Sequence, residues 1–223
     1  MIKYFHIAAG LNFIKKNIRK VIKMQIMFHV KEGVREYVNR GRKYPFPPPP
    51  VKRCNNPHCN KIVHYKKHGF YERNYYSSEF GGKIIIRRYI CPLCSHTISY
   101  IPSFCLPRFI NAVKHIFDYI CCSFYRKGSI KSVIEYLNSK IGIQFSRQIL
   151  YHYRKRFIDN INAIQAGIRQ LIGGVKLPDT NLGKGKKARE VLAIMRTEYQ
   201  DIQVFSQQFH QTVTKTFLAL NKL

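Results

Sequence analysis

Acidic side chains are scarce in this sequence. Its 223 residues include 11 Asp and Glu against 39 Lys and Arg, which gives a formal net charge of +28. No carboxylate occurs in residues 1–31, 80–117 or 136–158. Two-metal cleavage of phosphodiesters needs clustered carboxylates, so the sequence predicts a protein that is not an enzyme.

Long apolar runs are also missing. No stretch approaches the roughly 18 uninterrupted apolar residues that a membrane-spanning helix needs, so no membrane span is expected. Apolar residues still make up 45% of the chain, which excludes a disordered basic tail of low hydrophobicity. A charge this far from zero is offset by a polyanion, either nucleic acid or an anionic membrane. We expect a nucleic-acid partner and a cytoplasmic, nucleoid-associated location.

Cysteine usage points to a metal rather than to disulfides. Seven cysteines are present, an odd number, and no signal-peptide cleavage pattern is found, so a disulfide framework is not expected. Four of them form two close pairs, Cys54 with Cys59 and Cys91 with Cys94. Because two such pairs of thiolates complete a tetrahedral shell around Zn²⁺, we predict one structural zinc ion on these four residues.

Alternatives remain open for the cysteines. Four residues separate the first pair, which leaves His58 as a substitute ligand for Cys59. Another alternative is a set of reduced core cysteines without a metal. Cys105, Cys121 and Cys122 are interpreted as core or surface residues, because adjacent helical positions point about 100° apart and do not easily share one ion.

The segment between the pairs has the pattern of a zinc β-ribbon. Aromatic and β-branched runs at residues 62–76 and 84–90 flank a Gly-Gly pair, so we expect strand, turn and strand leading into the second pair. Four thiolate ligands leave no open coordination position, which makes the site structural. Arg87 and Arg88 on the second strand are predicted to contact DNA.

The first 53 residues are predicted to form a basic helix and a stiff linker. Within residues 1–23, apolar side chains recur every three or four positions among lysines and arginines, as in an amphipathic helix. Such a helix could pack on the domain or touch a membrane surface or DNA, and it would not be made if translation begins at Met24. The four prolines at 47–50 favour an extended polyproline II spacer.

After Pro107 the pattern becomes helical. Apolar residues repeat with a helical period over residues 110–124, and Ser129 and Ser146 are suitable N-caps for two further helices. Three consecutive helices joined by short turns predict a helix-turn-helix. In that motif the first residues of the third helix enter the major groove. The alternative is an ordinary helical hairpin with a solvated basic face.

Most predicted DNA contacts lie on this third helix. Arg147 and Gln148 carry the side chains that pair with guanine and adenine edges, and residues one turn later are expected to hold phosphates. Tyr151 and His152 are further candidates for base contacts. The complete set of predicted DNA-binding residues is Arg87, Arg88, Arg108, Arg147, Gln148, Tyr151, His152, Arg154, Lys155 and Arg156.

Residues 173–223 are predicted to form a linker and one long helix. Residues 183–187 are rich in Gly and Lys but lack the spacing of a P-loop, and we interpret them as a flexible basic linker. Residues 188–222 contain no Gly or Pro and carry apolar residues at near-heptad intervals. Such a stripe packs on its own domain or on a second copy, so a homodimer through residues 188–222 is one expectation.

In this order, the motifs resemble the DNA-binding N-terminal region of insertion-sequence transposases. They resemble more closely a family of uncharacterised bacterial proteins that combine a zinc ribbon with a helix-turn-helix, and the likeness spans roughly residues 24–172. The residues that carry it are Cys54, Cys59, residues 68–73, Arg88, residues 91–94, residues 103–108 and residues 145–151. Transposases of this kind continue into a ribonuclease-H-like domain with three metal-binding carboxylates. This chain departs from them after the third helix, so strand transfer by it alone is not expected.

The expected fold is therefore α+β, with a zinc ribbon at 54–107, a helix-turn-helix at 108–172, and the segments 1–53 and 173–223 on either side. The expected function is zinc-dependent binding of double-stranded DNA without a catalytic domain. One alternative is binding of single-stranded nucleic acid or RNA by the basic aromatic strands at 66–71 and 87–89. Another is a DNA-targeting subunit of a transposase or nuclease whose carboxylates come from a partner.

Overall fold

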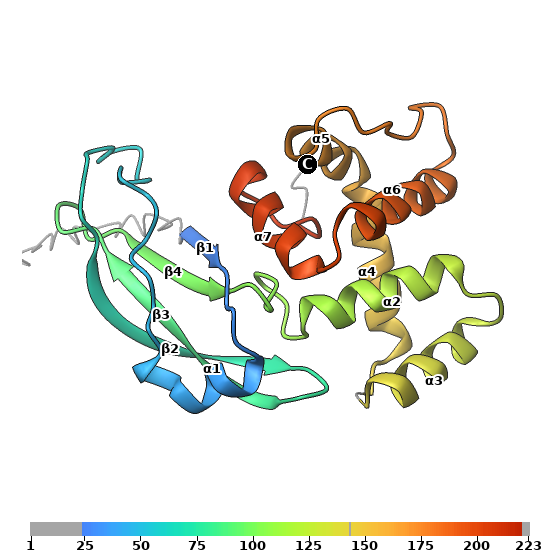
Figure 1. The fold of residues 1–223 in the computed structure, drawn as a ribbon, viewed down its shortest axis with the longest axis horizontal. Coiled ribbons are helices and arrows are strands. Elements are labelled where there is room, and N and C mark those ends of the chain that lie inside the picture. The colour runs from blue at the N-terminus through green and yellow to red at the C-terminus, as the bar shows by residue number, and fades with distance from the viewer. Residues whose placement is uncertain (1–23, 143, 220–223) are drawn as a thin grey trace, which may run out of the picture.

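The fold combines one sheet with a group of helices, which confirms the predicted α+β class (Figure 1). The computed structural model describes residues 24–142 and 144–219, so the helix predicted for residues 1–23 lies outside the described residues. We call residues 24–105 the sheet unit and residues 106–219 the helical unit. In chain order the elements are β1 (Met24–Phe28), α1 (Val34–Arg40), the 3-10 helix η1 (Gly41–Lys43), β2 (Lys66–Tyr76), β3 (Gly81–Ile90), β4 (Thr97–Pro102), α2 (Val113–Tyr125), α3 (Ile130–Ile141), α4 (Arg147–Asp159), α5 (Ile161–Leu171), α6 (Lys184–Glu198) and α7 (Ile202–Val213).

The sheet is mixed, with strand order β1-β4-β3-β2. The strand, turn and strand predicted between the cysteine pairs form the antiparallel β2–β3 hairpin. The sequence pattern does not predict the strand β1. It pairs in parallel with β4 and places Met24 opposite Ile98. The prediction that residues 1–53 contain only a helix and a linker was therefore wrong, because β1 belongs to the sheet. Its partner lies about 70 residues away, so no local pattern indicates the pairing.

Aromatic side chains fill the core of the sheet unit. Tyr37 of α1 is fully buried, and its ring centroid lies 4.7 Å from that of Tyr44 and 5.3 Å from that of Phe104. Its hydroxyl donates a 2.5 Å hydrogen bond to the carbonyl of Ile85 on β3. A buried tyrosine needs such a partner, so this contact anchors α1 to the sheet.

The proline-rich segment lies along the sheet instead of projecting as a free spacer. The hydroxyl of Tyr89 donates to the carbonyl of Pro47 at 2.8 Å, and that of Tyr100 donates to the carbonyl of Pro48 at 3.0 Å. Proline lacks an N–H but keeps its carbonyl acceptor. Two strand tyrosines therefore hold the extended segment that leads to the first cysteine pair.

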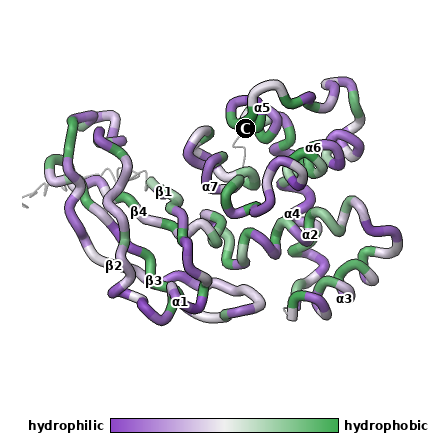
Figure 2. Tube along the Cα trace, in the orientation of Figure 1, coloured by the Kyte–Doolittle hydropathy of each residue, from purple (hydrophilic) through white to green (hydrophobic). Residues whose placement is uncertain are grey.

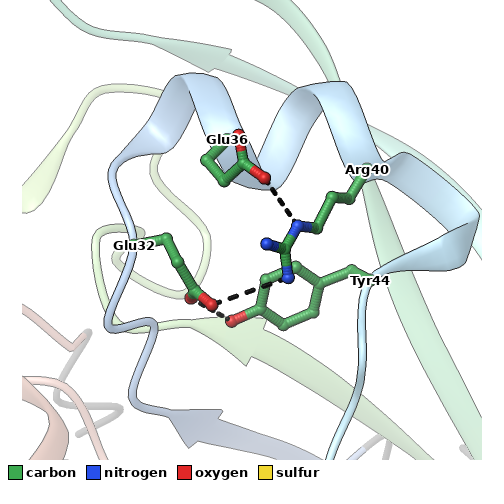
Figure 3. A network of polar contacts seen from close by, with 4 residues as sticks. All are labelled: Glu32, Glu36, Arg40 and Tyr44. Atoms are coloured by element: carbon green, nitrogen blue, oxygen red, sulfur yellow. Dashed lines mark hydrogen bonds and ion pairs between the residues drawn. The ribbon is translucent and has the colours of Figure 1, made fainter.

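A small polar network surrounds the end of α1 (Figure 3). Arg40 donates to Glu36 at 2.6 Å and lies 3.8 Å from Glu32, and Tyr44 donates to Glu32 at 2.9 Å. Burial and this hydrogen bond raise the pKa of Tyr44 to about 12. These exposed ion pairs add little to stability, but they neutralise two of the few carboxylates of the chain.

The helices α3 and α4 begin at the N-caps that the sequence predicted. Ser129 accepts a 3.2 Å hydrogen bond from the N–H of Ser132 at the start of α3, and Ser146 accepts a 3.4 Å bond from Ile149 at the start of α4. Gly142 ends α3 with a φ of 72°. Ser, Thr, Asp and Asn at the N-cap and Gly at the C-terminus satisfy backbone groups that a helix leaves unpaired.

The prediction of a single long helix over residues 188–222 was wrong. Two helices occupy this region, α6 and α7, and Asp201 caps the second by accepting a 2.8 Å bond from the N–H of Gln203. Residues 183–187 are not a linker either, because α6 begins at Lys184 and the buried Lys187 donates to the carbonyl of Thr180 at 3.0 Å.

The predicted apolar stripe of this region is buried within the chain. Leu192, Met195, Ile202 and Phe209 belong to the core that α2 to α7 share. Figure 2 shows green, apolar segments recurring along the helices of this unit. These four residues are therefore covered within the chain, and the homodimer through residues 188–222 stays a prediction. Among the described residues, no helix has both the length and the apolar character to cross a membrane.

A close approach of α5 and α7 generates a stability prediction. A Cβ added at Gly167 would lie 2.3 Å from the ring of Phe209, which is 1% exposed and cannot move aside. We expect Gly167→Ala to lower the free energy of unfolding by about 1–3 kcal/mol through overpacking. In chemical denaturation, the matched change Gly185→Ala in α6, which has nothing within 4 Å, should leave stability unchanged or slightly higher. Equal stability of the two variants would contradict the packing.

Candidate metal centre and basic helix surface

The two cysteine pairs converge at one end of the sheet. The sulfur atoms of Cys54, Cys59, Cys91 and Cys94 all lie within 4.8 Å of one another. Those of Cys54 and Cys94 are 3.5 Å apart, and those of Cys59 and Cys91 are 4.0 Å apart. A tetrahedral shell with metal–sulfur bonds of about 2.3 Å separates its sulfurs by about 3.8 Å. The spacing fits a single tetrahedral metal ion.

Both pairs lie on turns that share a backbone hydrogen bond and a residue of positive φ. In each, the N–H of the first cysteine donates to the carbonyl two residues after the second, from Cys54 to Lys61 and from Cys91 to His96, at 2.8 Å in both cases. The residue directly after the second cysteine has a positive φ, 42° at Asn60 and 58° at Ser95. Such a turn presents two sulfurs from one loop to a common point.

The longer first turn absorbs its two extra residues locally. The carbonyl of Asn56 accepts from the N–H groups of Cys59 and Asn60, each at 2.9 Å, and its side chain accepts from the N–H of His58 at 3.1 Å. Asparagine commonly closes such turns through its own side chain. The four-residue gap therefore brings Cys59, and not His58, to the cluster.

The environment of the sulfurs differs from one to the next. Burial raises the pKa of Cys54 to about 12. Burial would also raise the pKa of Cys94, but hydrogen bonds from the backbone N–H of His96, the side chain of Asn56 and neighbouring thiols lower it to about 7. Thiolates are the form that binds a metal, so the hydrogen bonds around Cys94 favour the form that a metal ion needs.

The remaining cysteines stay apart from the cluster. Cys105 is fully buried in the core of the sheet unit, which raises its pKa to about 12. Cys121 and Cys122 lie partly buried on α2 and pack against the helical core. Four sulfurs and no open position can hold a structural ion but cannot bind a substrate.

The start of α4 presents an exposed polar surface. Arg147, Gln148, Tyr151, His152 and Lys155 all have exposed side chains there. The opposite side of the helix is buried in the helical core, through Leu150, Tyr153 and Phe157. Arg147 is held in place, since its guanidinium donates to the hydroxyl of Tyr151 at 3.2 Å and lies 5.4 Å from the centre of that ring.

Asn138 positions the turn that leads into α4. Its side-chain oxygen accepts from the hydroxyl of the buried Tyr119 at 2.5 Å and from the N–H of Phe145 at 3.0 Å. The contact joins α2, α3 and the residues just before Ser146. This partly buried network favours one arrangement of the three helices.

Two of the predicted phosphate contacts on α4 have structural roles instead. Arg154 donates to the carbonyl of Ser123 at 2.8 Å and lies 4.4 Å from the ring of Phe124. Arg156 donates to the carbonyl of Leu218 at 3.0 Å, so it ties α4 to the C-terminal segment. The sequence did not distinguish them from Lys155, whose exposed amine pairs with Asp159 at 2.9 Å.

The three other predicted contacts lie away from α4. Arg87 stacks over the ring of Phe70 at 4.4 Å, and Arg88 donates to the hydroxyl of Thr97 at 3.1 Å. Both are half-buried on β3. Arg108 is exposed, with a φ of 71°, on the loop that joins the two units.

The structure adds a basic aromatic cluster that the sequence analysis missed. The guanidinium of Arg126 lies 3.6 Å from the ring centre of Tyr136 on α3, and the amine of Lys140 lies 5.9 Å from it. All three are exposed. The signal available in the sequence was the Tyr136–Lys140 pair, four residues apart on one helix face.

Metal content is the direct check of the cysteine cluster. We expect about one tightly bound metal ion per chain in protein purified without chelator, measured by elemental analysis. Cys91→Ser should abolish stoichiometric binding because it removes a buried ligand, whereas Cys121→Ser, which lies outside the cluster, should retain it. A metal-free wild type, or equal metal content in both variants, would contradict the site.

No family model matches this chain, and no curated protein or solved structure is significantly similar to it. The resemblance to the front part of transposases therefore rests on the quoted motifs alone. Any statement about function has to come from the geometry of the cysteine cluster and of the basic surfaces.

Proposed function

We propose that the protein binds double-stranded DNA and reads bases with the first two turns of α4. The observation that carries the proposal is the exposed, acid-free start of this helix, where Arg147, Gln148 and Tyr151 point away from the core. Arginine pairs with guanine and glutamine with adenine in the major groove. The N-terminus of a helix also favours a phosphate, because its N–H groups are unpaired.

The order α2, α3, α4 supports a helix-turn-helix arrangement. The three helices share one core, and Ser146 and Asn138 define the turn before α4. In that motif the second helix crosses the DNA backbone. Here α3 would do so, and the exposed Arg126, Lys131 and Lys140 in and next to α3 are the cations available for phosphates.

We further propose zinc as the metal of the cysteine cluster. Closed tetrahedral sets of four thiolates are typical of structural zinc, although iron also takes sulfur ligands. Among the described residues, the hydrophobic cluster at this site consists of Val63, Tyr65 and the four cysteines. Such a small core needs the ion for its stability, so zinc would hold the loops at 52–65 and 91–96 in place.

The charge of the sheet unit supports a polyanionic partner as well. Its carboxylates lie on and near α1 and the β2–β3 hairpin, where Glu36 pairs with Arg40 and Glu72 with Lys83 at 2.9 Å. Residues 45–71 at the cysteine end contain five Lys and Arg and no Asp or Glu. That end would lie against DNA more favourably than the α1 end.

Binding of single strands by the sheet is less favoured. Tyr89 is 2% exposed, and the ring of Phe70 is already covered by Arg87 at 4.4 Å and Arg42 at 5.9 Å. Stacking on a base needs an open aromatic face. The strands therefore offer a poorer platform than their composition suggested.

Selection from a random duplex library, followed by affinity measurements on the selected site, tests the proposal. We expect Arg147→Gln to reduce discrimination against a mismatched base pair by about 1–3 kcal/mol. Arg169→Gln on α5, which removes the same exposed charge, should preserve discrimination. Affinity should fall steeply with salt as counterions are displaced.

Three outcomes would contradict the proposal. They are the absence of duplex binding at moderate salt, tighter binding of single strands than of duplex in direct competition, and equal loss of discrimination in both variants. Metal-dependent nicking of DNA by the purified chain would instead contradict the prediction that it is not an enzyme.

A further inference from the structure

A cavity of about 850 Å³ lies between the sheet unit and the helical unit. Its walls come from β1, the segment before the first cysteine pair, the loop at 107–109, α4, α7 and residues 214–219. Sites for small molecules usually have volumes of roughly 300–1,000 Å³ and occur preferentially between domains. None of the DNA contacts proposed on the first two turns of α4 lines this cavity.

The charge of the cavity has one sign. Arg108, Arg156 and Lys215 line it, and no aspartate or glutamate is among its lining residues. His96 and His210 also line it, but burial lowers the pKa of both, so they add no positive charge at neutral pH. Cations gathered around a partly enclosed space repel one another and attract an anion. Asn55, Gln25 and Thr216 add neutral hydrogen-bonding groups.

Two polar groups of the lining residues have no hydrogen-bond partner. They are Nε of Arg156 and Nε2 of His96, both buried. Arg156 is also fixed, because it donates to the carbonyl of Leu218 at 3.0 Å and stacks on Phe109 at 5.3 Å. Both atoms are enclosed by protein, each with less than 1 Å² of accessible surface, so contacts to an anion in the cavity fall to the exposed Arg108 and Lys215.

The backbone of the wall is strained at two places. Arg108 and Thr214 line the cavity with φ values of 71° and 58°. The other non-glycine residues with positive φ in the described part of the chain are Asn60 and Ser95, which shape the cysteine turns. Thr214 takes this conformation as the left-handed C-cap that ends α7, and Arg108 takes it on the loop between the two units.

The rest of the wall is apolar. Ile26, Val51 and Phe109 present aliphatic and aromatic surface between the cations. We propose that this cavity binds a small organic anion with an aromatic body, of about the size of a nucleoside monophosphate. Its phosphate or carboxylate pairs with Arg108 and Lys215 beside Arg156, and its ring packs on Phe109. This binding does not depend on the proposed DNA recognition.

A pair of matched fluorescent probes tests the inference on the full chain. 8-Anilinonaphthalene-1-sulfonate carries an aromatic body and one anionic group, and N-phenyl-1-naphthylamine has the same body without the charge. We expect saturable binding of the sulfonate at about one per chain. Its affinity should exceed that of the neutral probe by roughly tenfold or more, because only the sulfonate adds charge-assisted contacts to the apolar contact that both probes make.

Substitutions then locate the probe. Arg108→Gln with Lys215→Gln removes two exposed cations from the wall without touching the core, and it should abolish the preference for the sulfonate. Lys184→Gln with Lys186→Gln removes the same charge from the start of α6, outside the cavity, and should preserve it. Circular dichroism and thermal unfolding confirm that both variants are folded.

The inference is overturned if the full chain shows no saturable binding of the sulfonate. It is also overturned if the two probes bind equally, since apolar contact alone would then explain the signal. Equal loss of preference in the two double variants would attribute binding to net charge and would overturn it as well.

Discussion

Arginine side chains hold this structure together by donating to backbone carbonyls rather than to carboxylates. Arg73 of β2 donates to the carbonyls of Leu106 and Phe109, which fixes the loop between the two units. Arg154 and Arg156 of α4 donate to the carbonyls of Ser123 and Leu218, which ties α4 to α2 and to the C-terminal segment. With 39 basic residues and 11 acidic ones, few carboxylates are available, and the ion pairs found among the described residues are all on the surface. Backbone carbonyls and aromatic rings therefore serve as the partners of these arginines, a role that carboxylates often have in other proteins.

The same scarcity separates two kinds of basic residue. Those that reach a carbonyl or a ring inside the fold, such as Arg73 and Arg154, contribute to packing. Other basic residues remain exposed, such as Arg147 and the lysines of the cysteine end. Their charges are available to bind a polyanion. Basic residues thus serve both packing and the proposed binding. The number of charges in the sequence does not show which residue has which role.

Local patterns predicted the local features well. Ser129 and Ser146 cap the helices they were expected to cap, because an N-cap acts within three residues of itself. The four cysteines were identified by spacing, because each turn presents its own pair of sulfurs. The prediction of one long helix after residue 188 was wrong because α6 ends at Glu198 and Asp201 is the N-cap of a second helix.

By itself, the sequence determined which four cysteines cluster, the N-caps of α3 and α4 and the excess of positive charge, since each depends on residue types or on their short spacing. Only the tertiary structure decided that β1 joins β4 across about 70 residues, that the stripe of α6 and α7 is buried, and that Arg156 faces a cavity while Arg147 faces solvent. The physical reason is that burial depends on what packs against a side chain. Those partners come from distant segments, and no local period specifies them.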